Sequence, residues 1–154
     1  MKMQTALIII AIVIAGYVAV IGSSGKPMSG NDTTIVITIA DVELKVWLAD
    51  NMAKRAQGLS GTKSLPKDGG MLFDFGTPTT PGFWMKDMNY AIDIIWIDEN
   101  LKVIGTTENV EPNTFPRTFN PPSPIRYVLE VQAGFVKDKK ITAGEANARI
   151  HLYQ

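Results

Sequence analysis

The first part of the chain is apolar and uncharged. Lys2 and Lys26 enclose 23 residues without a charge, and the run from Ala6 to Ile21 is apolar almost throughout. A membrane-spanning helix needs about 20 apolar residues, whereas the core of a cleaved signal peptide needs only about 7–15. The pattern predicts a membrane anchor over residues 1–24, followed by a flexible linker of Gly, Pro, Ser and polar residues over 25–32. A cleaved signal segment, which would leave a secreted domain, is the alternative.

The remaining residues, 33–154, alternate between apolar and polar positions in short segments. Residues 42–48 show this alternation clearly, which predicts a strand with one buried face, and the preceding residues 35–39 predict its hairpin partner. Similar patterns predict further strands at 71–75, 83–86, 91–97, 101–106, 126–131 and 146–152. Helical segments are expected at Met52 to Gln57, with Asp50 as N-cap and Gly58 as C-terminal stop, and within residues 133–140.

This succession of elements predicts the fold class. About eight short strands, one or two short helices and frequent turns favour a single mainly β domain, a sandwich or a barrel. Residues 107–124 form a long predicted loop that holds five of the nine prolines. Structureless loops of more than about 12–15 residues are usually functional or disordered. Phe115 and Phe119 indicate that this loop is held against the domain.

Composition narrows the chemistry that the domain can perform. Lys+Arg and Asp+Glu both number 15, so the chain lacks the basic surplus expected of a nucleic-acid-binding protein. The absence of cysteine excludes disulfides, thiolate metal sites and cysteine nucleophiles. His151 is the single histidine, so common histidine-based catalytic and metal sites would depend on it. We therefore expect no cofactor and no metal.

Residues 82–97 place charged side chains among aromatic and apolar ones. Trp84 and Lys86 share one face of the predicted strand, where an aromatic surface beside a cation suits the wall of a ligand pocket. The same tryptophan could instead fill the core. Asp93 shares a strand face with isoleucines, where an ionised carboxylate needs a partner.

Asp93 has three open interpretations. It could bind a ligand or act as an acid or base, it could face solvent, or it could form a structural ion pair with Arg55, Lys86 or Arg126. Arg126 and Glu130 lie on one face of the predicted strand 126–131. They could be solvated surface charges or members of one network with Asp93.

Seven motifs resemble, in their order and spacing, those of a known family. They are Arg55-Ala-Gln-Gly-Leu59, Ser64-Leu-Pro66, Gly70-Met-Leu-Phe-Asp-Phe75, Phe83-Trp-Met-Lys86, Asp93-Ile-Ile-Trp-Ile-Asp98, Glu108-Asn-Val110 and Arg126-Tyr-Val-Leu-Glu-Val-Gln-Ala-Gly134. The chain resembles the domain of unknown function 192 family from about Val42 to Ile150. These are small prokaryotic proteins that are often exported or membrane-tethered. The resemblance implies a compact, β-rich, jelly-roll-like fold and no established activity.

The chain departs from the family pattern at two places. Thr62 stands where the resemblance implies an arginine, which weakens any anion-binding role that depends on that arginine. The proline-rich loop lacks the cysteine pair that some relatives carry, so a local disulfide is not available here.

These observations predict an uncharacterised, membrane-tethered domain outside the cytoplasm that binds a ligand or partner of the cell envelope. A glycan, a peptide or a protein would suit, and no nucleic acid is expected. The expected binding residues are Trp84, Lys86, Asp93, Glu108 and Arg126, with Arg55 and Glu130 in a structural network.

Two other functions remain open. The domain could be an acid/base hydrolase or lyase that acts on an envelope polymer through Asp93 and Glu108, if the two carboxylates share a solvent-open cleft. It could also be a structural accessory subunit, marked by an exposed apolar patch without a concave pocket.

Overall fold

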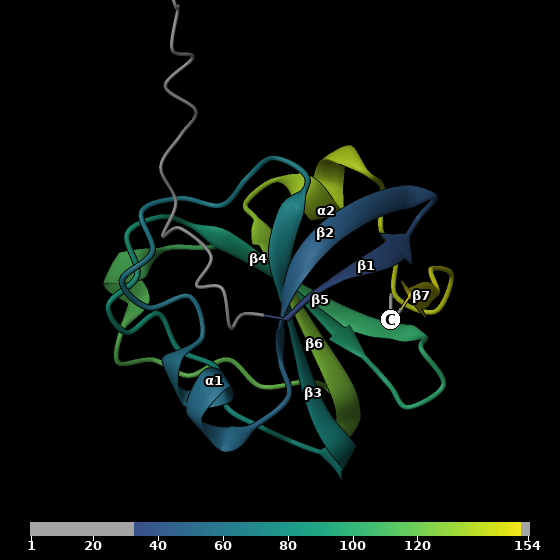
Figure 1. Cartoon of the computed structure of the whole chain (residues 1–154), viewed down its shortest axis with the longest axis horizontal. Coiled ribbons are helices and arrows are strands. Elements are labelled where there is room, and N and C mark those ends of the chain that lie inside the picture. Colours follow the sequence, from purple (N-terminus) through teal and green to yellow (C-terminus); the bar gives the residue numbers. More distant parts are fainter. Residues whose placement is uncertain (1–32, 152–154) are drawn as a thin grey trace, which may run out of the picture.

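The computed structural model describes residues 33–151, which form one mixed β-sheet with two short α-helices and a 3-10 turn (Figure 1). The mainly β class with short helices is thus confirmed. The strands are β1 (Thr34–Ile39), β2 (Val42–Ala49), β3 (Gly69–Thr79), β4 (Ile92–Ile97), β5 (Val103–Val110), β6 (Ile125–Gln132) and β7 (Ala148–His151). Their order in the seven-stranded sheet is β5-β4-β6-β3-β2-β1-β7.

The predicted anchor and linker, residues 1–24 and 25–32, lie outside the described residues. Within residues 33–151, no helix has the length and apolar character needed to cross a membrane.

The predicted hairpin at the start of the domain is confirmed as the antiparallel pair β1–β2. Its two-residue turn, Ala40 and Asp41, has φ values of 47° and 59°. Positive φ at both central residues matches the twist of the flanking strands, which is why such turns favour hairpins. The isoleucines of β1 alternate into the core, as the strand period requires.

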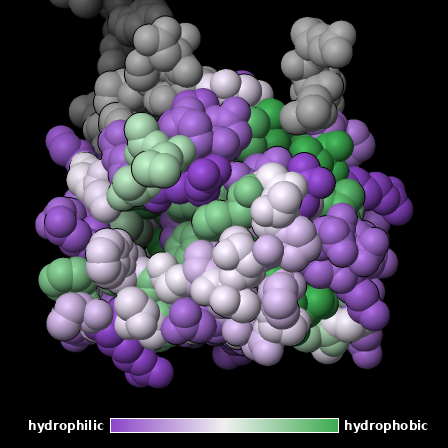
Figure 2. Space-filling model, turned by 90° about the horizontal axis from the view of Figure 1, so that it is seen from below, coloured by the Kyte–Doolittle hydropathy of each residue, from purple (hydrophilic) through white to green (hydrophobic). Residues whose placement is uncertain are grey.

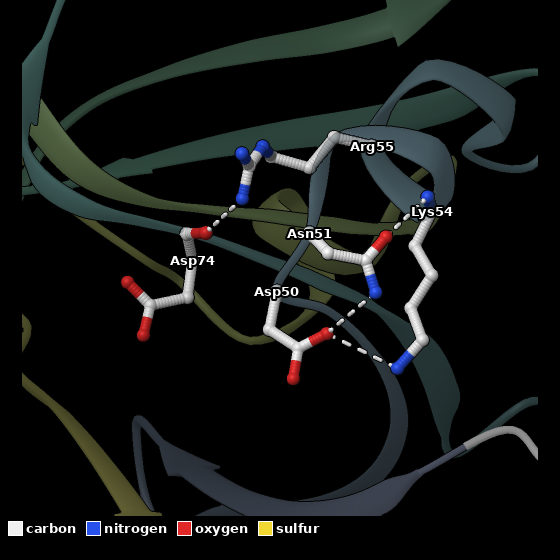
Figure 3. A network of polar contacts seen from close by, with 5 residues as sticks. All are labelled: Asp50, Asn51, Lys54, Arg55 and Asp74. Atoms are coloured by element: carbon white, nitrogen blue, oxygen red, sulfur yellow. Dashed lines mark hydrogen bonds and ion pairs between the residues drawn. The ribbon is translucent and has the colours of Figure 1, made fainter.

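Helix α1 (Met52–Gln57) connects β2 to β3, which run parallel, and it has the predicted bounds. Its N-cap is Asn51, whose side-chain oxygen accepts a hydrogen bond from the Lys54 N–H at 3.0 Å (Figure 3). Asp50, the predicted cap, instead accepts from Lys54 Nζ at 3.1 Å. Both residue types are good caps, so composition alone could not place the cap to the residue. Gly58 ends the helix with a φ of 51°.

The centre of the sheet has a hydrophobic cluster on each face. All six residues of β4 are buried, and its five apolar residues are divided between the two clusters. Ile95 and Ile97 belong to the cluster that includes β1, β2 and helix α2 (Phe135–Asp138). Ile94 and Trp96 belong to the other cluster, on the face where Leu59 and Phe73 also pack. The face to which a β4 side chain points therefore determines which of the two clusters it packs in.

The predicted strand at 83–86 is wrong. Phe83 forms only an isolated bridge with Phe119, so this segment belongs to the irregular chain that crosses one face of the sheet. Strand β5 is longer than predicted and ends at Val110, which shortens the proline-rich loop. The 3-10 turn Pro112–Thr114 then gives that loop some regular structure.

The last strand, β7, pairs with β1 and lies near the start of β5. The Val103 N–H donates to the Ala146 carbonyl at 3.0 Å, and the Ala148 N–H donates to the Leu101 carbonyl at 2.8 Å. The two ends of the strand order thus meet through a few hydrogen bonds.

Candidate functional site

A cavity of about 340 Å³ opens between α1, β3, β6 and the irregular segment around Phe83. This volume falls within the range of small-molecule pockets, about 300–1,000 Å³. Most of its wall is aromatic or otherwise apolar: Met52, Leu59, Phe73, Phe75, Phe83, Trp84 and Met88. Figure 2 shows the molecule from below the view of Figure 1, where hydrophobic residues lie in and beside a hollow among hydrophilic ones. We call this cavity the aromatic cavity.

Phe83 organises the aromatic wall. Its ring packs edge-to-face against Phe73, with ring centroids 4.9 Å apart, and against Trp96 at 5.6 Å. Phe75 lies 6.4 Å away in a similar orientation. Edge-to-face packing adds about 0.5–1.5 kcal/mol to each aromatic pair, so these rings hold one another in place. The wall is therefore held by contacts among its own rings.

Trp84 lies at the rim of the aromatic cavity, with 54% of its surface exposed. Its ring packs against Phe115 of the proline-rich loop at 6.1 Å. Met52 of α1, also at the rim, is more exposed still. Large apolar side chains at the mouth of a hollow are a common property of ligand-binding sites.

Arg55 projects from α1 and also lines the aromatic cavity. Its Nη1 donates to the main-chain carbonyl of Asp74 at 2.8 Å (Figure 3). The guanidinium lies 5.2 Å from the centroid of the Phe75 ring. This cation–π contact and the hydrogen bond fasten α1 to β3.

Glu130 is the one acidic residue of the cavity wall, and it comes from the central strand β6. Only 5% of it is exposed, and its neighbours across the sheet are Met71 and Ile94, which carry no charge. Among the described residues, its carboxyl makes no hydrogen bond and no ion pair. Burial raises the pKa of Glu130 to about 8, so the side chain is mostly a neutral acid at pH 7.

The charge of Glu130 acts on Tyr90, which lies in the segment before β4. Burial and the charge of Glu130 both raise the pKa of Tyr90, against a hydrogen bond with Thr62 that lowers it. The hydroxyls of Tyr90 and Thr62 lie 2.6 Å apart. The hydroxyl of Tyr90 is thus hydrogen-bonded to Thr62. Thr62 stands at the position where the family resemblance implied an arginine.

Asp93 lies in the core on the other face of the sheet. It has no exposed surface, and its two oxygens accept hydrogen bonds from the main-chain N–H groups of Asn109 at 2.8 Å and Val136 at 2.9 Å. Within residues 33–151 it forms no ion pair with the three cations proposed from the sequence. The carboxylate therefore joins β5 and α2 to β4, and it does not line the aromatic cavity.

The other expected site residues lie apart from this cavity. Lys86 and Glu108 are exposed on the surface. Arg126 forms an ion pair with Asp74 at 3.2 Å and lies over the ring of Tyr127. The structure thus brings Trp84 together with Arg55 and Glu130, the two residues expected in a structural network, and leaves the rest of the expected binding set outside.

Sequence reasoning missed most of the wall. Phe73 and Phe75 were expected only as strand residues, and Met52 and Met88 were not singled out. The alternation around Phe73 and Phe75 indicates a strand, but the other residues of the wall come from α1 and from the segment around Phe83. Within residues 33–151, no group of three or more His, Asp or Glu side chains is placed to hold a metal ion.

A second, smaller cavity of about 40 Å³ adjoins the C-terminal end of α1. Gln57 and Gly58 line both cavities, so this end of the helix forms a shared wall. Trp47 lines the small cavity, and its buried indole N–H lacks a hydrogen-bond partner among the described residues. The volume suits one or two water molecules and no larger ligand.

Comparison with known proteins places this fold among bacterial structures. A crystal structure named "putative transcription regulator", from Sinorhizobium meliloti 1021, has 27% sequence identity and a TM-score of 0.72, covering 77% of this chain and 95% of that chain. A protein of unknown function from Novosphingobium aromaticivorans DSM 12444 has 23% identity and a TM-score of 0.69, covering 83% and 94% respectively, which shows the fold alone. A search of curated proteins found no match.

The family resemblance seen in the seven sequence motifs is confirmed by a family model. The model for DUF192, described as "Uncharacterized ACR", matches residues 35–147. This range includes β2 to β6 and all of β1 but its first residue, it ends before β7, and it includes every residue that lines the aromatic cavity. The chain therefore belongs to the DUF192 family.

Proposed function

We propose that this domain binds a small ligand in the aromatic cavity, with a ring or apolar part against the aromatic wall and a polar group on Glu130. One observation carries the proposal: Glu130, a residue that is 95% buried and whose carboxyl makes no hydrogen bond among the described residues, lines a cavity of about 340 Å³. Concave, mostly apolar sites with a few polar groups are the usual form of small-molecule pockets.

Glu130 has an energetic cost for folding. Buried polar groups are nearly always hydrogen-bonded, and leaving one unsatisfied costs about 1–3 kcal/mol. The same sheet satisfies Asp93 fully with two main-chain N–H groups. Glu130 weakens the free domain instead, so its presence is better explained by a partner that arrives from outside. A ligand with a hydrogen-bonding group would supply that partner.

We also propose that the apolar segment over residues 1–24 tethers the domain outside the cytoplasm. The support is the length of the uncharged run and the single lysine that precedes it. On this proposal the ligand belongs to the cell envelope or its surroundings, as a glycan, a peptide or a small metabolite.

The hydrolase or lyase alternative has less support. Asp93 is enclosed in the core and hydrogen-bonded at both oxygens, whereas Glu108 is exposed. A pair of catalytic carboxylates must face one substrate across a few ångströms of open space. Neither residue lines the aromatic cavity, so binding in that cavity gives them no common substrate.

A thermal-unfolding screen of the full chain, followed by tryptophan fluorescence, tests the binding function. The panel would contain monosaccharides, short peptides, aromatic alcohols and aliphatic and aromatic amines. A ligand at 100 times its Kd should stabilise the folded state by about 2.7 kcal/mol. Trp84→Ala and Glu130→Gln should reduce this stabilisation, because both residues line the cavity.

Lys86→Ala is the matched control, because Lys86 is exposed, close to Trp84 in sequence, and absent from the cavity wall. It should respond to ligands as the parent does. A panel that stabilises none of the proteins, or stabilises the cavity variants as strongly as the parent, would refute the proposal.

A further inference from the structure

We infer that the ligand of the aromatic cavity carries a protonated amine, which pairs with the carboxylate of Glu130 between the aromatic walls. This inference rests on the proposed function and names the chemical class of the ligand. It depends on three features of the cavity: the missing counter-charge of Glu130, the aromatic wall, and the state of its proton.

The first feature is the missing counter-charge. Arg55, the cation that lines the cavity from α1, is held by the Asp74 carbonyl and the Phe75 ring. Tyr90, in the segment before β4, carries no charge at neutral pH, because its pKa is raised above the ordinary value of a tyrosine. A buried carboxylate is stable only with a partner of opposite charge or with several hydrogen bonds. A cationic ligand would supply the charge that the described residues do not.

The neighbouring strands do not provide that charge either. Met71 on β3 and Ile94 on β4 flank Glu130 and are uncharged. Asp74 on β3 and Arg126 on β6, the strand of Glu130, form an ion pair with each other, and neither lines the cavity. The neighbouring strands therefore leave the negative charge of ionised Glu130 without a counter-charge, which one bound cation would supply.

The second feature is the aromatic wall. The face of an aromatic ring is electron-rich and attracts cations within about 6 Å of its centroid. The chain already uses this property in the cavity, because the Arg55 guanidinium lies 5.2 Å from the Phe75 centroid. Trp84, the residue type that binds cations best, stands half exposed at the rim. An amine at Glu130 would thus enter a cavity whose wall is rich in aromatic rings.

The third feature is the proton on Glu130. Burial raises the pKa of this residue to about 8, so the free domain at pH 7 holds mostly the neutral acid. When an ammonium ion binds, the O–H bond of the acid breaks, the proton passes to solvent, and the carboxylate pairs with the ligand. No other reactant is required.

This proton release sets the pH dependence of binding. Only the deprotonated fraction of Glu130 can form the ion pair, and this fraction rises tenfold for each pH unit below its pKa. Affinity for an amine should therefore tighten by about 50-fold from pH 6 to pH 8 and then level off. A neutral ligand that accepts a hydrogen bond from the protonated acid would show the opposite trend.

Isothermal titration calorimetry of the full chain tests the inference. The probes are cyclohexylamine and 2-phenylethylamine, each compared with its neutral isostere, cyclohexanol and 2-phenylethanol. An aliphatic amine resembles the lysine side chain and stays protonated up to about pH 10, so the probe does not change charge over this range. Titrations at pH 6, 7 and 8, each in two buffers of different ionisation enthalpy, measure affinity and proton release together.

We expect at least one amine to bind more than tenfold tighter than its alcohol at pH 8, with close to one proton released at pH 6–7. Glu130→Gln should abolish the preference for amine, the pH dependence and the proton release. Glu108→Gln, an exposed acid outside the cavity, should change none of the three.

Three outcomes would overturn the inference. They are amines that bind no tighter than their alcohols at pH 8, affinity that does not depend on pH in the parent, and no binding of either amine at millimolar concentration. If alcohols or sugars bind in a manner that depends on Trp84, the proposed function stands and the amine assignment fails. If no compound of the thermal-unfolding screen stabilises the protein either, the proposed binding function and the amine assignment both fail.

Discussion

Two buried acids on neighbouring strands of this sheet have opposite surroundings. Ile94 on β4 pairs with Glu130 on β6, and Asp93, the preceding residue, pairs with Val131. Adjacent positions point to opposite faces, so the two acids lie almost back to back across the sheet. Asp93 meets two main-chain N–H groups in a closed core, whereas Glu130 meets a cavity and no hydrogen-bonding partner among the described residues.

The contrast shows that burial alone does not mark a functional acid. Both side chains are almost fully hidden from solvent. What separates them is whether the fold itself supplies the hydrogen bonds that burial demands. Asp93, an expected binding residue, contributes to the fold through its hydrogen bonds, and Glu130 is the acid whose carboxyl lacks a hydrogen-bond partner among the described residues.

The largest effect should come from changing pH around Glu130. The folded-state pKa of about 8 lies above the usual value of 4.5, so the folded chain binds the proton more tightly than the unfolded chain. The stability of the parent should be greatest below about pH 4.5 with respect to this group, and should fall as pH rises towards 8. The loss should be of the order of 5 kcal/mol, at about 1.36 kcal/mol for each unit between the two values.

Glu130→Gln isolates this contribution, because the amide keeps the shape and does not titrate. Urea denaturation of parent and variant from pH 5 to pH 9 should give a stability difference that grows in favour of the variant as pH rises. Parallel pH profiles for the two proteins would show that Glu130 is not a buried, unpaired acid.

A smaller effect is expected on the other side of the comparison. Asp93→Ala removes the acceptor for two N–H groups, those of Asn109 and Val136. Leaving a buried donor unsatisfied costs about 1–3 kcal/mol, so the variant should lose about 4 kcal/mol of unfolding free energy. Denaturant titration measures the loss, with Glu108→Ala as an exposed control that should stay within about 0.5 kcal/mol of the parent. A loss below about 1 kcal/mol would contradict this account of Asp93.

The smallest effect should occur at the rim of the cavity. Trp84 is 54% exposed and packs mainly against Phe115, so Trp84→Ala should cost less than about 1 kcal/mol of stability. Trp96 is almost fully buried in a hydrophobic cluster of the sheet, so Trp96→Ala should cost about 3–5 kcal/mol of stability. Thermal melts of both variants provide the comparison. Equal losses would place Trp84 in the core and remove it from the site.

Local patterns predicted the elements well. The alternation of residues 42–48 gave the second strand of the first hairpin, and the bounds of α1 matched residue by residue. These features depend on neighbours within a few positions, which a single sequence displays directly. Strand parity also placed Asp93 among isoleucines and put Glu130 and Val128 on one face, as observed.

The site could not be predicted in the same way, because its parts come from distant segments. The partners of Asp93 are main-chain N–H groups 16 and 43 positions away, and a main-chain donor has no side-chain signature. The alternation of side chains along residues 126–131 placed Glu130 on one face of the strand, but it does not indicate which segment covers that face. The cover is provided by α1 and the segment around Phe83, which the short alternation at 83–86 had suggested was a strand.

The contact between the two ends of the strand order has a consequence for solubility. An open edge strand offers unpaired N–H and C=O groups that a second chain can extend, which is a common route to aggregation. Here the residues around Val103 and Ala146 occupy some of those groups on both β5 and the segment before β7. Each end of the sheet thereby shields part of the other, so a chain that lost β7 would expose the flank of β1 and the start of β5 at the same time.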